Sequence, residues 1–323
     1  MQELLKIEDL KTHFSTHDGT VKAVDGVSLQ INRGETLGIV GESGCGKSVT
    51  ALSIMRLIAD PPGKIVDGKI LFEGQNLLDL DERQMRDIRG KKISMIFQEP
   101  MTSLDPVFTI GSEIIETLQI HQNLDRKEAR LQTIDVLSTV GIPDADKRVD
   151  SYPHELSGGM RQRAMIAMAL ACNPALLIAD EPTTALDVTI QAQILRLINE
   201  LKSKFDTSVL LITHDLGVIA EMSEYVAVMY CGHIVEYADV HTLFENPLHP
   251  YTKGLYRSIP RLDVEAKRLD TISGMVPNLI DLPLGCPYQN RCEYCFDTCL
   301  KEMPALLPVA DQHLVKCHLY RGN

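Results

Sequence analysis

The chain has 323 residues, a length for which about two domains are expected. Its composition, 44% hydrophobic and 24% charged, is ordinary for a globular protein, and its formal net charge of −12 argues against nucleic acid as a partner, because phosphate backbones attract basic surfaces. No stretch approaches 18 uninterrupted apolar residues, and the opening MQELLKIEDLK has no signal-peptide core. We therefore expect a cytosolic chain with reduced thiols and no membrane span of its own.

Short strands alternating with helices are predicted along most of the chain, which indicates an α/β fold. Residues 21–31 alternate like a half-exposed strand, and residues 36–41 form a continuous apolar run typical of a strand buried on both faces. A helix is predicted to follow, through Ile58. Similar buried strands are predicted at 92–97, 175–180, 208–213 and 225–230.

Two further regions differ from this α/β pattern. Residues 99–174 are mainly helical, with apolar residues at three- and four-residue spacing, and read as a helical insertion. Beyond residue 240 the periodicity loosens and prolines break the chain into turns. We predict an α/β domain over 1–240, with a helical subdomain at about 99–174, and a small irregular extension over 241–323.

The octapeptide GESGCGKS, Gly41–Ser48, fits the pattern G-x-x-x-x-G-K-[ST] where a predicted strand meets a predicted helix. Its glycines let backbone N–H groups surround a β-phosphate, Lys47 brings a positive charge to the β- and γ-phosphates, and Ser48 offers a hydroxyl to Mg²⁺. A chance glycine turn is the alternative, but it would not require that strand and helix. The predicted nucleotide-binding residues are Gly41, Glu42, Ser43, Gly44, Cys45, Gly46, Lys47, Ser48 and Val49.

A second motif, ALLIADEP, ends a predicted apolar strand with two carboxylates. Asp180 can hold the Mg²⁺ shell, and Glu181 can polarise the attacking water or accept its proton. A pair of charges at a helix N-terminus is the alternative. Together with the phosphate loop, the motif indicates a nucleoside triphosphatase.

The segment LSGGMRQR, Leu156–Arg163, resembles the signature LSGGQ of ATP-binding cassette (ABC) ATPases, with Met160 in place of glutamine. It lies one helix upstream of the strand that ends at Asp180, where the family has its signature. Ser157, Gly158 and Gly159 at a helix start would form a second phosphate cradle. In the family this cradle serves the nucleotide of a partner subunit.

The ABC resemblance covers about residues 4–240. It implies a RecA-like mixed sheet, an antiparallel β subdomain, a helical subdomain, and ATP with Mg²⁺ as cofactors. It also implies that Gln98 contacts Mg²⁺ or its water, that His214 contacts the γ-phosphate, that TALD at Thr184–Asp187 is the D-loop, and that Phe14 stacks on adenine.

A narrower resemblance, to the oligopeptide/dipeptide (and nickel) import ATPases and most of all to the dipeptide branch, is carried by QEPMTSLDP (98–106) and NPLHPYTKGLYRSIP (246–260). It implies a peripheral ATPase at the cytoplasmic face of a prokaryotic membrane. Its partners would be a second ABC ATPase subunit, with a heterodimer expected, two transmembrane permease subunits and an extracytoplasmic peptide-binding protein. Alternatives are nickel as substrate, a non-transport ABC ATPase acting on nucleic acid or ribosomes, and a regulatory iron–sulfur protein.

Five of the eight cysteines lie in the last 38 residues. Reducing conditions argue against disulfides, and five thiols in 32 positions are too concentrated for core filling, which leaves metal ligation as the favoured explanation. The resemblance extends to the cysteine pattern and implies Cys286, Cys292, Cys299 and Cys317 as ligands, with Cys295 as the extra. We predict a structural [4Fe–4S] cluster, with zinc and unligated thiols as the alternatives.

Overall fold

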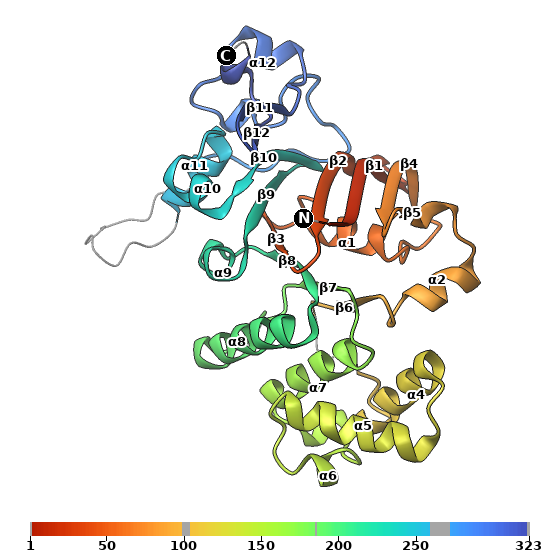
Figure 1. Cartoon of the computed structure of the whole chain (residues 1–323). Helices are drawn as coiled ribbons and strands as arrows, with labels where there is room; N and C mark the ends of the chain where they lie inside the picture. The colour runs from red at the N-terminus through yellow and green to blue at the C-terminus, as the bar shows by residue number, and fades with distance from the viewer. Residues whose placement is uncertain (1, 99–103, 185, 259–271, 322–323) are drawn as a thin grey trace. The chain divides into compact units, whose positions relative to one another are not determined.

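The computed structural model (Figure 1) describes residues 2–98, 104–184, 186–258 and 272–321. It contains two compact units, each built from several stretches of the chain. We call them the first and the second unit. The first consists of Met1–Leu4, Ile31–Glu35 and Asp79–Leu211, and the second consists of Leu5–Gln30, Thr36–Leu78 and Ile212–Asn323.

The second unit contains a four-stranded sheet with the order β2-β1-β4-β5, in which β4 pairs antiparallel with β1 and with β5 (Figure 1). Leu5 and Ile7 of β1 are fully buried while Lys6 between them is partly exposed, which is the alternation that a sheet with one covered face requires. This is the antiparallel part that the resemblance implied. The strands are β1 (Glu3–Thr16), β2 (Gly19–Asn32), β4 (Gly63–Phe72) and β5 (Gln75–Asn76).

A second sheet of this unit carries the phosphate loop at one end. β3 pairs parallel with β9, β9 antiparallel with β10, β10 with β12, and β12 with β11. β3 is buried along its whole length and β9 at all but its first residue, which explains their continuous apolar sequences. The strands are β3 (Thr36–Val40), β9 (Tyr225–Tyr230), β10 (His233–Asp239), β11 (Leu307–Ala310) and β12 (His313–Val315).

The last residues of the chain therefore share a sheet with the ATPase-type part. β12 lies beside β10, and β11 lies on the other side of β12 (Figure 1), although β10 ends at Asp239 and β12 begins only at His313. The join is reinforced by Glu236 of β10, which is fully buried and accepts a hydrogen bond from Nε2 of His313 at 2.8 Å and from the backbone N–H groups of Leu248 and His249. The predicted boundary near residue 240 stays a prediction, and β10 and β12 pair across it.

The second unit also holds short helices, one of which differs from its prediction. α1 was expected to run to Ile58 but ends at Ile54, because Arg56 adopts a left-handed backbone conformation (φ 50°) that a helix cannot continue. The helices are α1 (Lys47–Ile54), α9 (Leu216–Met222), α10 (Val240–Glu245), α11 (Pro250–Arg257) and α12 (Asp297–Lys301).

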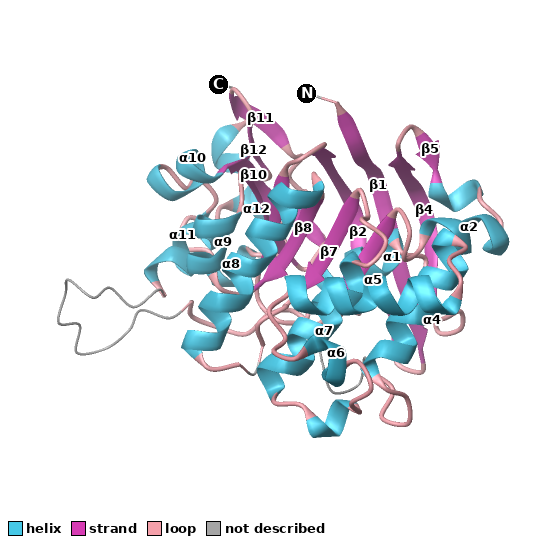
Figure 2. Ribbon diagram, turned by 60° about the horizontal axis from the view of Figure 1, so that its bottom comes forward, coloured by secondary structure: helices cyan, strands magenta, loops and turns pink. Residues whose placement is uncertain are grey.

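The first unit combines a parallel strand pair with a helical block. β6 (Ile93–Ile96) pairs with β7 (Leu176–Asp180). In the block, α4, α5 and α7 contact one another (Figure 2), as the helical periodicity predicts. Side-chain caps fix the helix starts: Thr109, Asp125, Ser157 and Asp187 each accept a backbone hydrogen bond from the first turn that follows. The helices are α2 (Glu82–Ile88), α4 (Ile110–Gln122), α5 (Arg126–Thr139), α6 (Ala145–Arg148), α7 (Gly158–Leu170) and α8 (Val188–Phe205). β8 (Ser208–Thr213) leads the chain from this unit into the second.

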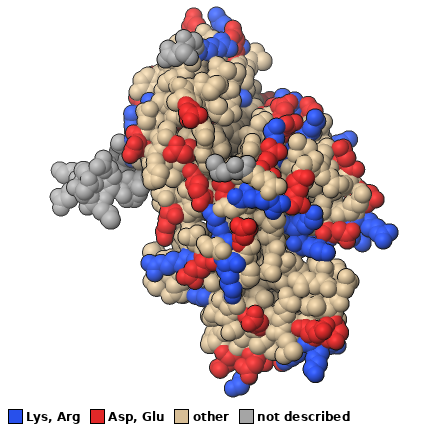
Figure 3. All heavy atoms as spheres, viewed as in Figure 1, with Lys and Arg blue, Asp and Glu red and all other residues tan. Residues whose placement is uncertain are grey.

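Two surface properties bear on the expectations from sequence. Within the described ranges, no helix is both long and apolar enough to cross a membrane. Acidic and basic side chains are interspersed on the face shown in Figure 3, so the negative net charge is not gathered in one patch of that face.

Two buried histidines predict an acid-sensitive fold. Burial lowers the pKa of His233 and of His249 to about 4 each, from 6.5. The unfolded chain protonates these rings near pH 6.5 and the folded chain does not, so stability is complete above that pH and is lost as the pH falls towards 4, by on the order of 1.4 kcal/mol per pH unit for each ring. Melting temperatures from pH 8 to 5 should fall less steeply for His233→Gln than for the wild type, and the exposed His17→Gln should match the wild type. The prediction would be contradicted if the melting temperature fell equally with pH in the wild type, His233→Gln and His17→Gln.

Candidate functional site

The predicted phosphate loop connects β3 to α1 and is closely packed. A Cβ at Gly41 would lie 2.2 Å from the carbonyl oxygen of Met229, and one at Gly46 would lie 2.1 Å from that of Ala23. Gly46 also has φ +106°, a conformation that side chains rarely adopt. Only glycine fits at these two positions, because the loop packs directly against the backbone of β9 at Met229 and of β2 at Ala23.

Lys47 lies at the centre of this loop. Its side chain is buried, with 5% of the residue exposed, and Nζ donates hydrogen bonds to the carbonyl oxygens of Gly41 (2.8 Å) and Glu42 (3.1 Å). A buried ammonium group within a glycine loop, at the first residue of a helix, is a donor set suited to phosphate oxygens. Ser48 follows, partly buried, in the first turn of α1. The residues present therefore fit the phosphates of a nucleotide with Mg²⁺.

Two other members of the predicted loop have specific surroundings. Burial raises the pKa of the Cys45 thiol, so the group is a neutral thiol at physiological pH and a poor nucleophile. The backbone N–H of Glu42 donates to the hydroxyl of Tyr251 (2.8 Å) and is not available to a phosphate in this arrangement. Sequence reasoning missed Tyr251, because no local pattern connects positions 209 residues apart.

Phe14 and His214 also belong to the second unit. Phe14 is half-buried in β1 opposite Gly63 of β4, and a Cβ on that glycine would come within 2.6 Å of the Phe14 ring. His214 is exposed and follows β8 directly, before Asp215, which caps α9. Their predicted roles, adenine stacking and γ-phosphate contact, stay predictions.

The first unit brings Gln98 and Glu181 together. Nε2 of Gln98 donates to the Glu181 carboxylate at 3.0 Å, and the Thr184 hydroxyl donates to the same oxygen at 2.9 Å. Glu181 follows Asp180, the buried last residue of β7, and has a left-handed backbone (φ 47°). Non-glycine residues rarely adopt this conformation, which is frequent at functional sites. The carboxylate of Glu181 is thus held in a defined position at the end of a buried strand.

The signature segment lies at the start of α7. Ser157 is the N-cap, its Oγ accepts the backbone N–H of Met160 at 3.3 Å, and both Ser157 and Gly158 are exposed. Further along α7, the amide of buried Gln162 donates to the carbonyl oxygen of Pro182, the residue after Glu181. The start of α7 is thus exposed at Ser157 and Gly158, while Gln162 of the same helix is hydrogen-bonded to the segment that follows β7.

Four of the five C-terminal cysteines line one small cavity of about 10 Å³ together with Tyr288 and His318. They are Cys286, Cys292, Cys299 and Cys317, the four predicted ligands; Cys295 is not among the lining residues. Burial raises the pKa of Cys286 to about 12 and that of Cys317 to about 11, so without a metal both are protonated thiols at neutral pH.

The arrangement of these thiols does not by itself form a metal site. Among the residues with described positions, no three Cys, His, Asp or Glu side chains are close enough to hold a metal ion. The cavity has room for about one water molecule. The donor set converges on one cavity, as a sulfur-bound metal centre requires, but the thiols would have to move to bind one.

Comparison with known proteins places this chain. Two families match it: "ABC transporter" over residues 24–184 and "Oligopeptide/dipeptide transporter, C-terminal region" over residues 235–299. It is 54% identical to the probable peptide ABC transporter ATP-binding protein y4tR of Sinorhizobium fredii, over 99% of this chain and 95% of that protein. It is 53% identical to the oligopeptide transport ATP-binding protein AppD of Bacillus subtilis (99% and 98% covered) and 49% identical to the dipeptide transport ATP-binding protein DppD of Escherichia coli (98% and 96%). The chain belongs to the ABC transporter ATP-binding proteins of the oligopeptide/dipeptide type.

Solved structures confirm the ABC fold. The ATP-binding cassette MJ0796, in a dimeric post-hydrolysis state with ADP and Pi, has a TM-score of 0.66 to this chain at 27% identity, covering 73% of this chain and 98% of that one. CbiO1 of Clostridium perfringens has a TM-score of 0.64 at 26% identity, covering 76% and 92%. The predicted α/β ABC-type fold is correct. As an ABC ATPase, the chain hydrolyses ATP, with ATP and Mg²⁺ as the expected cofactors.

Proposed function

We propose that this chain is the ATP-hydrolysing subunit of an importer for dipeptides and oligopeptides, bound peripherally at the cytoplasmic face of the cell membrane. The observation that carries the proposal is the combination of a complete phosphate loop with an oligopeptide/dipeptide-type C-terminal region in one chain. Relatives named for peptide, oligopeptide and dipeptide transport match it along nearly its whole length.

In this proposal each site residue has a defined task. Gly41–Val49 surround the phosphates, and Lys47 exchanges its loop carbonyls for phosphate oxygens. Ser48, Asp180 and Gln98 would hold Mg²⁺ or its water, His214 would contact the γ-phosphate, and Phe14 would stack on adenine. Glu181, already held by Gln98 and Thr184, orients the attacking water and accepts its proton.

The proposed partners are a second ABC ATPase subunit, two permease subunits and an extracytoplasmic peptide-binding protein. The outward position of Ser157 and Gly158 at the α7 start supports a dimer, because a neighbouring subunit's nucleotide could reach them. A neighbour in structure is described as dimeric. A heterodimer follows from the resemblance, in which the second ATPase is a related chain.

The isolated chain should therefore hydrolyse ATP slowly, because each site lacks the signature of a partner. Adding the second ATPase and the permease chains should raise turnover by at least about a hundredfold, the scale on which a missing preorganised donor acts. Steady-state phosphate release measures the rate, and sedimentation at assay concentration measures the oligomeric state. Full activity in a monomer would contradict the proposed dimer.

The transported substrate is tested by uptake. A strain lacking the gene for this chain should regain uptake of labelled dipeptides and oligopeptides when the wild type is supplied, but not with Glu181→Gln. Restored uptake of nickel alone would favour the nickel alternative. Co-purification with ribosomes or nucleic acid in place of permease chains would contradict an importer.

We also propose that Cys286, Cys292, Cys299 and Cys317 hold a structural [4Fe–4S] cluster, with zinc as the alternative. The convergence of these four thiols on one cavity supports it. Because a cluster separates its thiolates by its own irons and sulfides, its ligands need not approach one another as closely as those of a single ion.

Protein purified without oxygen should be brown and contain about four irons per chain. Serine at any of the four cavity positions should bleach it, and Cys295→Ser should not. Colourless protein with one zinc per chain would show that zinc, and not a cluster, is bound. Metal-free protein of normal stability would show that the four thiols bind no metal.

A further inference from the structure

Arg291, in the C-terminal extension, is bound to the phosphate loop. Its guanidinium donates to both carboxylate oxygens of Glu42, from Nη1 at 2.7 Å and from Nη2 at 3.0 Å. The remaining donors are also used: Nη1 reaches the Tyr230 hydroxyl at 3.3 Å, and Nε reaches the carbonyl oxygen of Ser273 at 3.1 Å. The Arg291 side chain is 3% exposed and that of Glu42 28%. A two-point ion pair of this kind fixes the orientation of the carboxylate as well as its charge.

A second contact from the same region of the chain holds the Glu42 backbone. The Tyr251 hydroxyl accepts the Glu42 N–H, and Tyr251 is fully buried. Its ring contacts those of Tyr230 and Tyr288, with centroids 4.6 and 5.6 Å apart. The Glu42 carbonyl oxygen, in turn, accepts a hydrogen bond from Lys47. The residue that helps to hold the phosphate-binding lysine is therefore itself fixed, through both backbone and side chain, by residues more than 200 positions later.

We propose that Arg291 is a positioning residue for ATP binding: it neutralises the Glu42 carboxylate on the loop that receives the phosphates and holds that part of the loop in shape. Glu42 places a full negative charge on a loop whose ligand is itself highly negative. With the guanidinium in place the pair is neutral, whereas without it the carboxylate repels the incoming phosphates in a partly buried setting, where screening is weak. This inference rests on ATP binding, which family membership shows, and not on the identity of the transported substrate.

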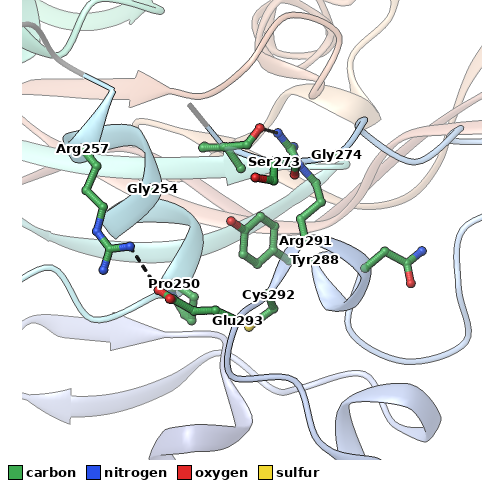
Figure 4. A pocket seen from close by; sticks show the side chains of 11 residues that line it. Pro250, Gly254, Arg257, Ser273, Gly274, Tyr288, Arg291, Cys292 and Glu293 are labelled. Atoms are coloured by element: carbon green, nitrogen blue, oxygen red, sulfur yellow. Dashed lines mark hydrogen bonds and ion pairs between the residues drawn. The ribbon is translucent and has the colours of Figure 1, made fainter. Parts of the chain in front are cut away.

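The surroundings of Arg291 make it suitable for substitution. Arg291 and Tyr288 form part of the wall of a pocket of about 520 Å³ (Figure 4). A shorter side chain at position 291 would extend this space and would not clash with any residue that the structure describes. Arg257 lines the same pocket, is half-exposed, and pairs with Glu293 at 3.2 Å (Figure 4). It provides a matched control, an arginine of the same pocket without a contact to the loop.

The experiment is an equilibrium titration of the full-length chain with a fluorescent ATP analogue and Mg²⁺. Arg291→Gln should raise Kd at least about tenfold, and the increase should change little with salt, because the repulsion acts in a partly buried setting. Arg291→Lys should raise Kd less than Arg291→Gln does, because it keeps the charge but loses the two-point contact. Arg257→Gln should bind like the wild type.

The double variant Glu42→Gln/Arg291→Gln separates positioning from simple anchoring of the extension. It has no unneutralised carboxylate, so its Kd should return to within about threefold of the wild type. A double variant that binds as weakly as Arg291→Gln, or an Arg291→Gln protein with unchanged Kd, would overturn the proposal. If Arg291→Gln does not fold, the single variant Glu42→Gln tests the proposal. It removes the carboxylate and leaves the positive charge of Arg291 near the phosphates, so it must bind ATP at least as tightly as the wild type. These readouts do not involve transport, so they can fail while the importer proposal stands.

Discussion

Replacing Glu181 by glutamine should lower ATP turnover at least about a hundredfold and leave ATP affinity within about twofold of the wild type. The carboxylate is held by the amide of Gln98 and the hydroxyl of Thr184 at the end of a buried strand, so it is already oriented for a water molecule. Glutamine has nearly the same shape but cannot accept the proton. Single-turnover hydrolysis in the assembled complex measures the rate of ATP hydrolysis, and nucleotide titration measures ATP affinity.

The control for this variant is Glu200→Gln, on the exposed side of α8, which should hydrolyse ATP normally. If Glu181→Gln hydrolysed ATP at nearly the wild-type rate, Glu181 would not be the residue that orients the attacking water and accepts its proton. A loss of affinity equal to the loss of turnover would make it a binding residue.

Replacing Lys47 by alanine should instead weaken ATP binding itself, by about a hundredfold, which is the scale of a lost charge-assisted hydrogen bond to a phosphate. Lys47 is 5% exposed and holds its ammonium group at the centre of the loop. Lys64→Ala, an exposed lysine on β4, removes the same charge from the same unit and should not change Kd. Melting temperatures of both variants check the fold, because Lys47 also bonds the loop carbonyls. Unchanged affinity in folded Lys47→Ala would refute the assignment.

The sequence predicted those parts of the fold that depend on local patterns. Continuous apolar runs located β3, β7, β8 and β9, because strands covered on both faces have no polar side to display. The phosphate loop and the end of β7 were located for the same reason, since their residues adjoin such strands. The end of α1 was wrong by four residues, because it depends on the left-handed conformation of Arg56, which no periodicity reveals.

Contacts between distant segments could not be predicted in this way. The pairing of β12 with β10 joins segments that lie far apart in sequence, and so do the hydrogen bonds from Arg291 and Tyr251 to Glu42. No local pattern connects either residue to the phosphate loop. The four cavity cysteines are an intermediate case. The resemblance to the family's cysteine pattern identified which thiols line one cavity, whereas binding of the predicted metal depends on distances between the thiols that a sequence does not determine.

The shared sheet of β10 and β12 limits how members of this family can be recombined. A chimera cut near residue 240 would pair β10 of one parent with β12 of the other, and a poor match would leave unpaired backbone groups along an open edge, where other chains can pair and aggregate. It would also separate His313 from the Glu236 carboxylate, so that this buried charge would have fewer hydrogen-bond donors. A transplanted extension should therefore bring β10 with it, so that the strand, its partner and the Glu236–His313 pair come from one parent.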